Sequence, residues 1–570
     1  MVLIIVLAIT IIATGFIART DVELACGENM LMGVQMNHLA ESALEHARVM
    51  LLEPQEATTS YWTGGSGIQL VWPSPDYYDV SVALDTSDAT DYCRYNVACE
   101  AYRKRNGQKV GRYGLSAVVR LDPAIGLWTS VDTTLRPNWV LHGDMRTLGT
   151  IINQAATASL DGDVFATTLT GTCVGQKRAY ADVSLTWPPV TGTYVKPPTA
   201  STNITTTTLT TNPGFTKIWR RAGDLALGGG VTVQGMLLVT GNLTVTGSGS
   251  RIAAGKNLPA LYVGGDLVLE DANNLSIEGL TVVAGNLRLR SNASGIKFTG
   301  GLCLGGTISE TITDASPSGN QAVVVGNPQW ITGSVDKALN LSAADGVSDY
   351  VQTTDSSSLL QLSGDYTLSL WLKAAATQNN NAGVMIRCSP DGASTHWGLQ
   401  FNATTPKLLV ARHLADGGNP WSTGITLDEI AGVWHHVAVV RSGTAMTSYL
   451  DGVQRMSGAW TYASGTGDGH LNLGAQATVA ATTLYAGAID DVHVYDHAWT
   501  AAEIAQIKAG QSLSYLIGRW RLDGPGSSVT ILADPIRASI ASWPNGLANP
   551  VVYWSPAAGA FYRSIARQLP

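Results

Sequence analysis

The amino-terminal segment constrains this chain more than any other part of its sequence. Residues Met1–Ala18 (MVLIIVLAITIIATGFIA) contain no charged side chain. As a helix they would measure about 27 Å, close to the roughly 30 Å hydrocarbon thickness of a bilayer. The segment lacks the basic start and the small-residue cleavage site of a secretory signal peptide, and it continues into Arg19 without a break. We therefore expect an uncleaved apolar helix that can sit in a membrane.

The helix is predicted to continue well beyond this apolar run. An amphipathic pattern with helical spacing follows Arg19. Its apolar residues include Met32, Met36, Leu39, Ala43 and Met50. Because the first proline is Pro54, residues 1–54 can form one helix of about 80 Å.

This two-part helix resembles the first helix of type IV pilins and pseudopilins. In that family the apolar half packs with its neighbours in a filament core, and the second half supports a globular head. The resemblance implies an assembly surface made of Val2, Leu3, Ile5, Val6, Ile9, Ile12 and Phe16. Most major pilins carry glutamate at the fifth mature position, where this chain has Ile5, and its absence is more typical of minor, tip-located pilin-like proteins. An ordinary single-pass membrane anchor is the alternative interpretation.

Composition indicates the fold class of the remaining chain. Only 14% of residues are charged and 61 are glycine, which is typical of a chain rich in strands and turns. The formal net charge is −8 and no basic block occurs, which argues against a nucleic-acid partner. The six cysteines are spread along the chain without a CxxC motif, so the spacing indicates no zinc site. We expect a mainly β protein with one long N-terminal α-helix.

Residues 55–137 are predicted to form a small antiparallel β head that packs on the helix. From Tyr77 to Asp122 the sequence alternates in short runs of polar and apolar residues. Arg105-Asn106-Gly107-Gln108 has the composition of a hairpin turn between two strands.

Residues 138–310 are predicted to form a β-solenoid. A Gly-Asp/Asn-apolar triplet recurs with a period near 20 residues, which is typical of stacked coils. The triplets begin at Gly143, Gly162, Gly223, Gly241, Gly265 and Gly285. Thr244-Val245, Val268-Leu269 and Arg288-Leu289 are then equivalent rungs, and the Pro/Thr-rich residues 187–214 form an excursion. We expect the solenoid to act as a stiff spacer; the alternative is a β-sandwich in which the triplets recur by chance.

Residues 311–510 contain motifs in an order and spacing that resemble the laminin-G-like, concanavalin A-like jelly-roll family. They include Gly364–Trp371, Trp434–Ala438, Tyr449–Gly452, Gly487–Tyr495 and Thr500–Ile504. The resemblance implies two packed antiparallel sheets, which the alternating runs and Gly/Asp turns also predict. The usual first strand of this family is missing before residue 320, and a segment of that appearance occurs at Leu516–Asp523 instead. We expect residues 511–570 to supply this strand and then to return toward the head.

The jelly roll shows no pattern of catalytic residues. Glycosidases on related folds generally need two closely placed carboxylates. Between Gly326 and Ala509 the only glutamates are Glu429 and Glu503, far apart in sequence. Asp490 and Asp491 are adjacent, so in a regular strand they would point to opposite faces. We expect a protein that is not an enzyme.

Binding is the better prediction for this domain. Carbohydrate sites combine an aromatic platform with a few polar groups. The candidates are Trp397, Trp421, Trp460 and Tyr462, each of which could equally belong to the core. Related domains often bind calcium through loop aspartates, and here the candidates are Asp345, Asp349 and Asp490. The sequence requires no cofactor, and calcium is the one ion that it suggests.

Together these features predict a structural subunit of an extracellular type IV pilus-like filament on the surface of a bacterium. Before assembly the helix would lie in the inner membrane, and it would then pack with copies of itself or with other pilin subunits. The lectin-like jelly roll would contact glycans or neighbouring cell surfaces. The alternatives are a singly membrane-anchored carbohydrate-binding protein, a minor pseudopilin of a secretion system, and an envelope hydrolase.

Overall fold

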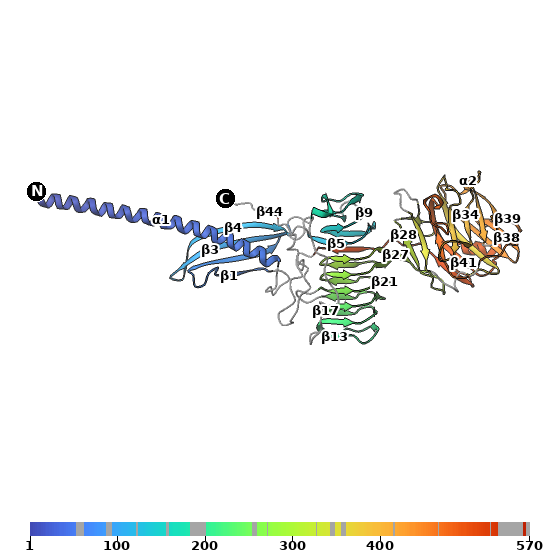
Figure 1. The fold of residues 1–570 in the computed structure, drawn as a ribbon, viewed down its shortest axis with the longest axis horizontal. Coiled ribbons are helices and arrows are strands. Elements are labelled where there is room, and N and C mark those ends of the chain that lie inside the picture. Colours follow the sequence, from blue (N-terminus) through green and yellow to red (C-terminus); the bar gives the residue numbers. More distant parts are fainter. Residues whose placement is uncertain are drawn as a thin grey trace.

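The computed structural model describes most of the chain. The described residues are 1–52, 62–86, 94–120, 124–154, 159–182, 201–253, 259–270, 272–326, 328–341, 348–354, 361–413, 416–465, 467–524, 526–533 and 563–565. They form one long helix, a small sheet, a β-solenoid and a β-sandwich, which follow one another along the long axis of the molecule (Figure 1). The predicted fold class is therefore confirmed.

Helix α1 (Val2–Leu52) supports a head made of five antiparallel strands. In sheet order these are β1 (Gly64–Ile68), β2 (Asp76–Leu84), β3 (Arg94–Arg105), β4 (Gln108–Arg120) and β44 (Arg563–Ile565). The turn between β3 and β4 is the predicted one, and Asn106 and Gly107 both have positive φ, as a tight hairpin turn requires.

The two halves of α1 have opposite surroundings. The side chains that the second half buries against the sheet are Met36, Ala40, Ala43, Ala47 and Leu51. Three of these five are alanines, whose small side chains let the sheet approach the helix closely. From Met1 to Leu31 every side chain is exposed, and the apolar window of the helix contacts nothing else in the molecule. By length and composition alone, α1 is long and apolar enough to cross a membrane.

The coils of the solenoid are built from short parallel strands on three faces. The first face consists of β14 (Thr208–Leu209), β16 (Leu225–Leu227), β18 (Leu243–Val245), β21 (Leu267–Leu269), β24 (Leu287–Arg290) and β27 (Ile308–Ile312). The other strands of these coils are β13 (Ser201–Asn203), β15 (Phe215–Arg221), β17 (Thr232–Val239), β19 (Arg251–Ala253), β20 (Leu261–Val263), β22 (Ser276–Glu278), β23 (Thr281–Val283), β25 (Ile296–Thr299) and β26 (Leu302–Leu304). On the first face Thr244 pairs with Val268, and Val268 pairs with Arg288, which are the predicted rungs.

A ladder of Asp and Asn side chains connects successive coils. Each Oδ1 accepts the backbone N–H of the equivalent or adjacent residue one coil further on. The pairs are Asp224 with Asn242 (2.7 Å), Asn242 with Asp266 (2.8 Å), Asp266 with Asn286 (2.8 Å) and Asn286 with Thr307 (2.9 Å). A Cβ at Gly265 would collide with Oδ1 of Asn242. The recurrent Gly-Asx pair therefore has one physical cause. The glycine of each pair leaves room for the Asx side chain of the preceding coil, and that side chain accepts the backbone N–H of the residue that follows the glycine.

The order of the coils in space differs from their order in sequence. A second set of strands stacks on the last coil: β5 (Ile125–Thr129), β6 (Thr133–Leu135), β7 (Trp139–His142), β8 (Asp144–Thr147), β9 (Thr150–Asn153), β10 (Val164–Phe165), β11 (Thr168–Thr170) and β12 (Lys177–Arg178). Leu127 on β5 pairs in parallel with Leu302 on β26, so the first coils in sequence lie beyond the last. The predicted boundary at residue 137 is thus too late, because β5 and β6 already belong to the solenoid.

The predicted excursion at residues 187–214 is wrong in its second half. β13 and β14 pair with β15 and β16, which makes residues 201–214 part of the solenoid. Residues 187–200 lie outside the described residues. The composition misled here because Thr is also a good strand former.

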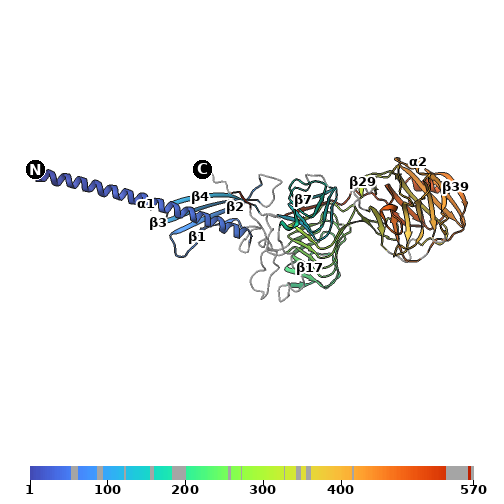
Figure 2. The same ribbon diagram turned by 45° about the horizontal axis from the view of Figure 1, so that its top comes forward.

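The solenoid lies across the molecule rather than along it. Its strands run roughly parallel to the long axis, and its coils stack across that axis, with the head on one side and the jelly roll on the other (Figures 1 and 2). The width of a coil, and not the number of coils, therefore sets the separation between head and jelly roll.

The jelly roll consists of two packed antiparallel sheets. Its strands and helices are β28 (Ala322–Val325), β29 (Gln329–Thr332), β30 (Lys337–Asn340), β31 (Tyr350–Thr353), β32 (Tyr366–Ala374), β33 (Gly383–Cys388), β34 (Thr395–Phe401), β35 (Leu408–His413), β36 (Trp421–Thr426), α2 (Leu427–Ile430), β37 (His435–Ser442), β38 (Ala445–Leu450), β39 (Val453–Ala459), β40 (His470–Leu473), β41 (Gly487–Tyr495), α3 (Ala501–Lys508) and β42 (Leu516–Trp520). One sheet contains β29, β30, β41, β32, β37, β38 and β39, with β42 paired to β41. The other is continuous with the first face of the solenoid through the antiparallel pair β27–β28.

A buried carboxylate reinforces this junction. Glu310 on β27 is fully buried, and it accepts hydrogen bonds from the backbone N–H (2.8 Å) and hydroxyl (2.6 Å) of Ser527. Its other oxygen accepts the indole N–H of Trp330 on β29 (3.3 Å). One side chain thus joins the solenoid, the jelly roll and the returning carboxy-terminal segment.

The carboxy-terminal segment passes back through all three parts. β42 occupies the strand position that the sequence assigns to Leu516–Asp523, and Trp520 is fully buried. β43 (Val529–Leu532) lies in the solenoid between β25 and β7, and β44 pairs with β4 in the head.

Candidate functional site

The aromatic residues predicted to bind sugar are largely core residues. Trp397 on β34 is fully buried, and Trp421 and Trp460 are exposed by only 8% and 6%. All three pack in the core between the sheets, where large indole rings gain most from burial. The prediction of an exposed stacking platform is therefore wrong for these three. Tyr462 is half-buried, and its role in binding stays a prediction.

The aspartates predicted to bind calcium do not form one cluster. Asp345 lies outside the described residues, while Asp349 and Asp490 pack against two different turns, at Gly326 and Gly333. Within the described part of the chain, no group of three or more His, Cys, Asp or Glu side chains could hold a metal ion. Calcium binding remains a prediction that depends on Asp345.

Asp490 is a buried carboxylate with one unpartnered oxygen. Its Oδ2 accepts the backbone N–H groups of Ser334 and Val335, both at 2.8 Å, while its Oδ1 has no hydrogen-bond partner. Burial, followed by the charge of neighbouring Asp491, raises its pKa to about 7, although the two N–H groups lower it. The group therefore anchors the turn between β29 and β30.

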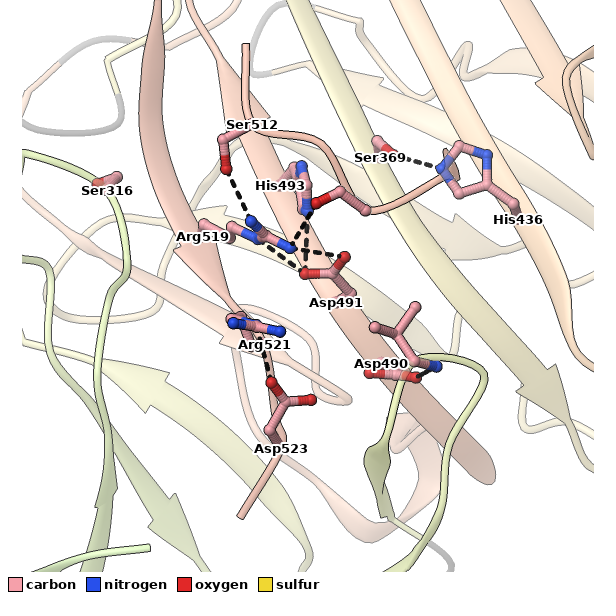
Figure 3. A network of polar contacts seen from close by, with 12 residues as sticks. Ser316, Ser369, His436, Asp490, Asp491, His493, Ser512, Arg519, Arg521 and Asp523 are labelled. Carbon is pink, nitrogen blue, oxygen red and sulfur yellow. Dashed lines mark hydrogen bonds and ion pairs between the residues drawn. The ribbon is translucent and has the colours of Figure 1, made fainter. Parts of the chain in front are cut away.

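Its neighbour Asp491 belongs to a separate polar network, which Figure 3 shows between β41 and β42. Arg519 donates to both carboxylate oxygens of Asp491 at 2.9 and 3.1 Å, and His493 Nε2 lies 2.9 Å from Oδ1. Burial raises the pKa of Asp491, but the bonds and charges of His493 and Arg519 outweigh it and hold the pKa below its usual value. The network fastens the returning strand β42 to the sheet.

The two adjacent aspartates have different partners because the strand is irregular. Asp491 has a positive φ of 41°, and the pairing of β41 with β32 shifts register at this point. Such a bulge re-aims side chains. The predicted separation of Asp490 and Asp491 therefore has a more specific basis than simple strand alternation.

The two glutamates of the jelly roll cap helices. Glu429 accepts the backbone N–H of Thr426 at 2.9 Å, and Glu503 accepts that of Thr500 at 2.8 Å. Neither carboxylate is placed beside the other as a catalytic pair requires.

Comparison with known proteins identifies the jelly roll at the level of its superfamily. Residues 345–505 match the family model described as the Concanavalin A-like lectin/glucanases superfamily. The jelly roll thus matches a concanavalin A-like domain. Among curated proteins no match is found.

Several solved structures are similar to this part of the chain. Domain 4 of AbnA, a GH43 extracellular arabinanase from Geobacillus stearothermophilus, in complex with arabinotriose, is 16% identical, with 35% of this chain and 98% of that chain covered and a TM-score of 0.27. A putative carbohydrate binding protein from Bacteroides ovatus is 17% identical, with coverages of 34% and 52% and a TM-score of 0.27. The binding domain of botulinum neurotoxin serotype C1 is 11% identical, with coverages of 36% and 53% and a TM-score of 0.28. This chain spans about half the length of the latter two, and likeness of this size carries no functional conclusion.

The exposed surface of the concanavalin A-like domain contains an aromatic residue that the sequence analysis missed. Tyr515 is 59% exposed, and among the described Trp, Tyr and Phe residues between 311 and 524 it alone is exposed by more than a third. Tyr515 lies in the connection between α3 and β42 with Leu513 and Leu516 close to it in the sequence, so no sequence signal distinguished this ring from the buried ones.

The predicted assembly residues of α1 are all exposed. Their side chains range from 49% for Ile5 to 84% for Leu3. The set is Val2, Leu3, Ile5, Val6, Ile9, Ile12 and Phe16. Apolar surface of this extent marks a site of contact with a membrane or a protein.

Proposed function

We propose that this chain is a structural subunit of an extracellular type IV pilus-like filament, which displays its jelly roll for adhesion through glycan binding. The observation that supports assembly most directly is the bare apolar half of α1, which continues without interruption into the half that carries the head. A helix of this kind is stable in lipid before assembly and in a bundle of identical helices afterwards.

The energetics of this transfer favour helix packing over simple dehydration. Lipid tails are as apolar as Ile9 or Ile12, so leaving the bilayer yields no hydrophobic gain. The gain comes from van der Waals contacts between helices and from contacts between heads. A charge within this segment would disrupt the close packing of helices, whereas a conservative change of apolar shape would not.

The adhesive half of the proposal is supported by the family match of residues 345–505 and by the rigid attachment of the jelly roll. The continuous sheet and the Glu310 junction hold this domain on the opposite side of the solenoid from the head. The capping roles of Glu429 and Glu503 support a binding domain rather than a hydrolase.

The test is a pair of substitutions at one position. Ile9→Asp should abolish filaments that contain this protein, and Ile9→Leu should leave them intact. The measurement is electron microscopy of filaments sheared from the producing cells, with mass spectrometry of the same fraction. Membrane fractions must contain comparable amounts of both variants, which separates an assembly defect from failed insertion. Normal filaments built from the Ile9→Asp protein would refute the assembly role.

A singly membrane-anchored carbohydrate-binding protein is the second candidate. The membrane-spanning length of the apolar run supports it, whereas Ile5, which stands where most major pilins have glutamate, favours a minor pseudopilin. A singly anchored protein is absent from sheared filaments and remains in membranes as single copies. A minor pseudopilin of a secretion system would instead produce a secretion defect on deletion.

A further inference from the structure

A small stack of aromatic rings lies on the surface of the jelly roll, where β41 leads into α3. The rings of His497 and Tyr515 are nearly parallel, at 13°, with centroids 4.6 Å apart. Trp499 contacts His497 edge-on at 4.4 Å and lies 6.1 Å from Tyr515. Because His497 covers one face of Tyr515 and 59% of this residue is exposed, its other face is open to solvent.

Contacts with strands β32 and β41 hold the stack of rings in place. The fully buried hydroxyl of Thr367 on β32 donates to the carbonyl of His497 at 2.8 Å and accepts the backbone N–H of Trp499 at 3.2 Å. Trp499 also packs edge-on against Tyr495 of β41. The rings therefore sit on a rigid strand framework and need little ordering to bind a ligand.

Tyr515 is also held in a strained backbone conformation. Its φ is +61°, a left-handed conformation that residues with a side chain rarely adopt. The carbonyl of Tyr515 accepts the backbone N–H of Asp496 at 3.2 Å, which fixes this turn against the end of β41. Strain that the surrounding structure maintains is found preferentially at functional sites.

The polar groups around the open ring favour an uncharged ligand with many hydroxyls. Asp496 is exposed beside Tyr515 and can accept hydrogen bonds from sugar hydroxyls. Glu503 lies close enough to His497 for their charges to interact. Exposed Gln511 and Ser514 add donors and acceptors on the same connection. Two carboxylates near the ring would repel a sialylated or uronate-containing sugar.

We propose that Tyr515, His497 and Asp496 form a binding site for neutral, pyranose-containing glycans, with the open face of Tyr515 stacked on a sugar ring. Aromatic faces stack on the apolar C–H face of a pyranose, and a carboxylate beside them binds its hydroxyls. This inference rests on the proposed adhesive function and specifies where and what the jelly roll binds.

The decisive variant is Tyr515→Gly. Glycine removes the ring and also relieves the left-handed strain, so the melting temperature should equal or exceed that of the wild type. Binding to immobilised neutral oligosaccharides of glucose, galactose and mannose should weaken about tenfold or more, as the loss of one stacking contact predicts. Tyr515→Phe keeps the ring and should bind within about twofold of the wild type. Asp496→Asn should also weaken binding.

The assay uses the full chain in detergent micelles, with sialylated and uronate-containing oligosaccharides as anionic probes. Val453→Ala is the matched control, because Val453 is 66% exposed on β39 of the same domain and should not affect binding. If the wild type binds neutral glycans and Tyr515→Gly binds them equally well, this site is wrong while the adhesive function stands. Preference for anionic glycans also overturns the site. If the wild type binds no glycan at all, the proposed adhesive function itself fails.

Discussion

At the scale of single residues, Asp490 is a carboxyl group whose neutral form the fold prefers. Its folded-state pKa of about 7 lies above the usual 3.8, so the folded chain binds the proton more tightly than the unfolded chain. This group therefore lowers the stability of the jelly roll progressively as the pH rises from about 4 to above 7. The buried Oδ1 has no hydrogen-bond partner to stabilise a negative charge, in agreement with the raised pKa.

Asp490→Asn should raise the melting temperature of the jelly roll at pH 8.5 and have little effect at pH 4. The amide can still accept the N–H groups of Ser334 and Val335, and it carries no charge to bury. The gain at alkaline pH is at most about 4 kcal/mol, from a shift of roughly three pKa units. Differential scanning calorimetry at both pH values measures it.

The control substitution, Asp451→Asn, should change the stability of the domain in the opposite direction. Burial raises the pKa of Asp451, but hydrogen bonds from the His436 backbone and the His435 side chain outweigh it and lower the pKa. Asp451→Asn should therefore destabilise the domain near neutral pH and above. An equal effect of Asp490→Asn at pH 4 and pH 8.5 would contradict the assignment.

Residue-scale features were the hardest to predict from sequence. Trp397 follows polar residues and Tyr515 precedes the apolar pair Leu516-Ile517, yet Trp397 is fully buried and Tyr515 is 59% exposed. Which of them faces solvent depends on strand register and on the bulge near Asp491, which are set by contacts between distant segments. Neither residue carries a local signal of its environment.

At the scale of elements, the Gly-Asx pair shows why the solenoid could be predicted from the sequence. Every coil must leave space for the same side chain at the same corner, so the physical requirement repeats with the period of the coils. The stacking of β5 on β26 left no such trace, because parallel pairing between residues 127 and 302 depends on no local motif. The corners were predictable and the order of the coils was not.

Gly265→Ala should destabilise the solenoid by about 1–3 kcal/mol, because the added methyl group would overlap Oδ1 of Asn242. Asn242→Ala removes the ladder bond to Asp266 and should cost about 0.5–1.5 kcal/mol. In the double variant the closest overlap, with Oδ1 of Asn242, is absent and only the tight contacts with the Gly241 backbone remain, so the two losses should not add fully.

Thermal unfolding of the full chain, followed by calorimetry, measures this pair. Gly364→Ala serves as the control, because an added Cβ there meets nothing within 4 Å. Strict additivity of the two solenoid substitutions would show that the glycine and the side chain act independently, contrary to the ladder.

At the scale of the whole molecule, the chain runs outward through head, solenoid and jelly roll and then returns through each of them. The sequence predicted the return from the late segment at Leu516–Asp523. It did not predict that the returning strand β43 would lie inside the solenoid, between β25 and β7. The spacer and the return path are therefore one structure.

Cleavage of the jelly roll should consequently leave the molecule assembled. A protease site inserted between Ala403 and Thr404, in the exposed turn between β34 and β35, divides the chain into two fragments that share both sheets. They should co-purify in native buffer and separate only in denaturant. A site between Glu23 and Leu24 is the control, because the exposed half of α1 has no contact to retain it once cut. Separation of the jelly-roll fragments without denaturant would contradict this description.

The return path also has a mechanical consequence. A pull between α1 and the jelly roll acts on one covalent route, which leaves the head through β5, and on a second route through β43, which is joined to the head only by the hydrogen bonds between β44 and β4. Because the strands of the solenoid run roughly along the direction of pull, the hydrogen bonds that hold β43 are loaded in shear and must break together rather than one after another (Figure 1). The parallel pairing of β43 with β25 and β7 therefore lets the solenoid resist such a pull through several hydrogen bonds at once.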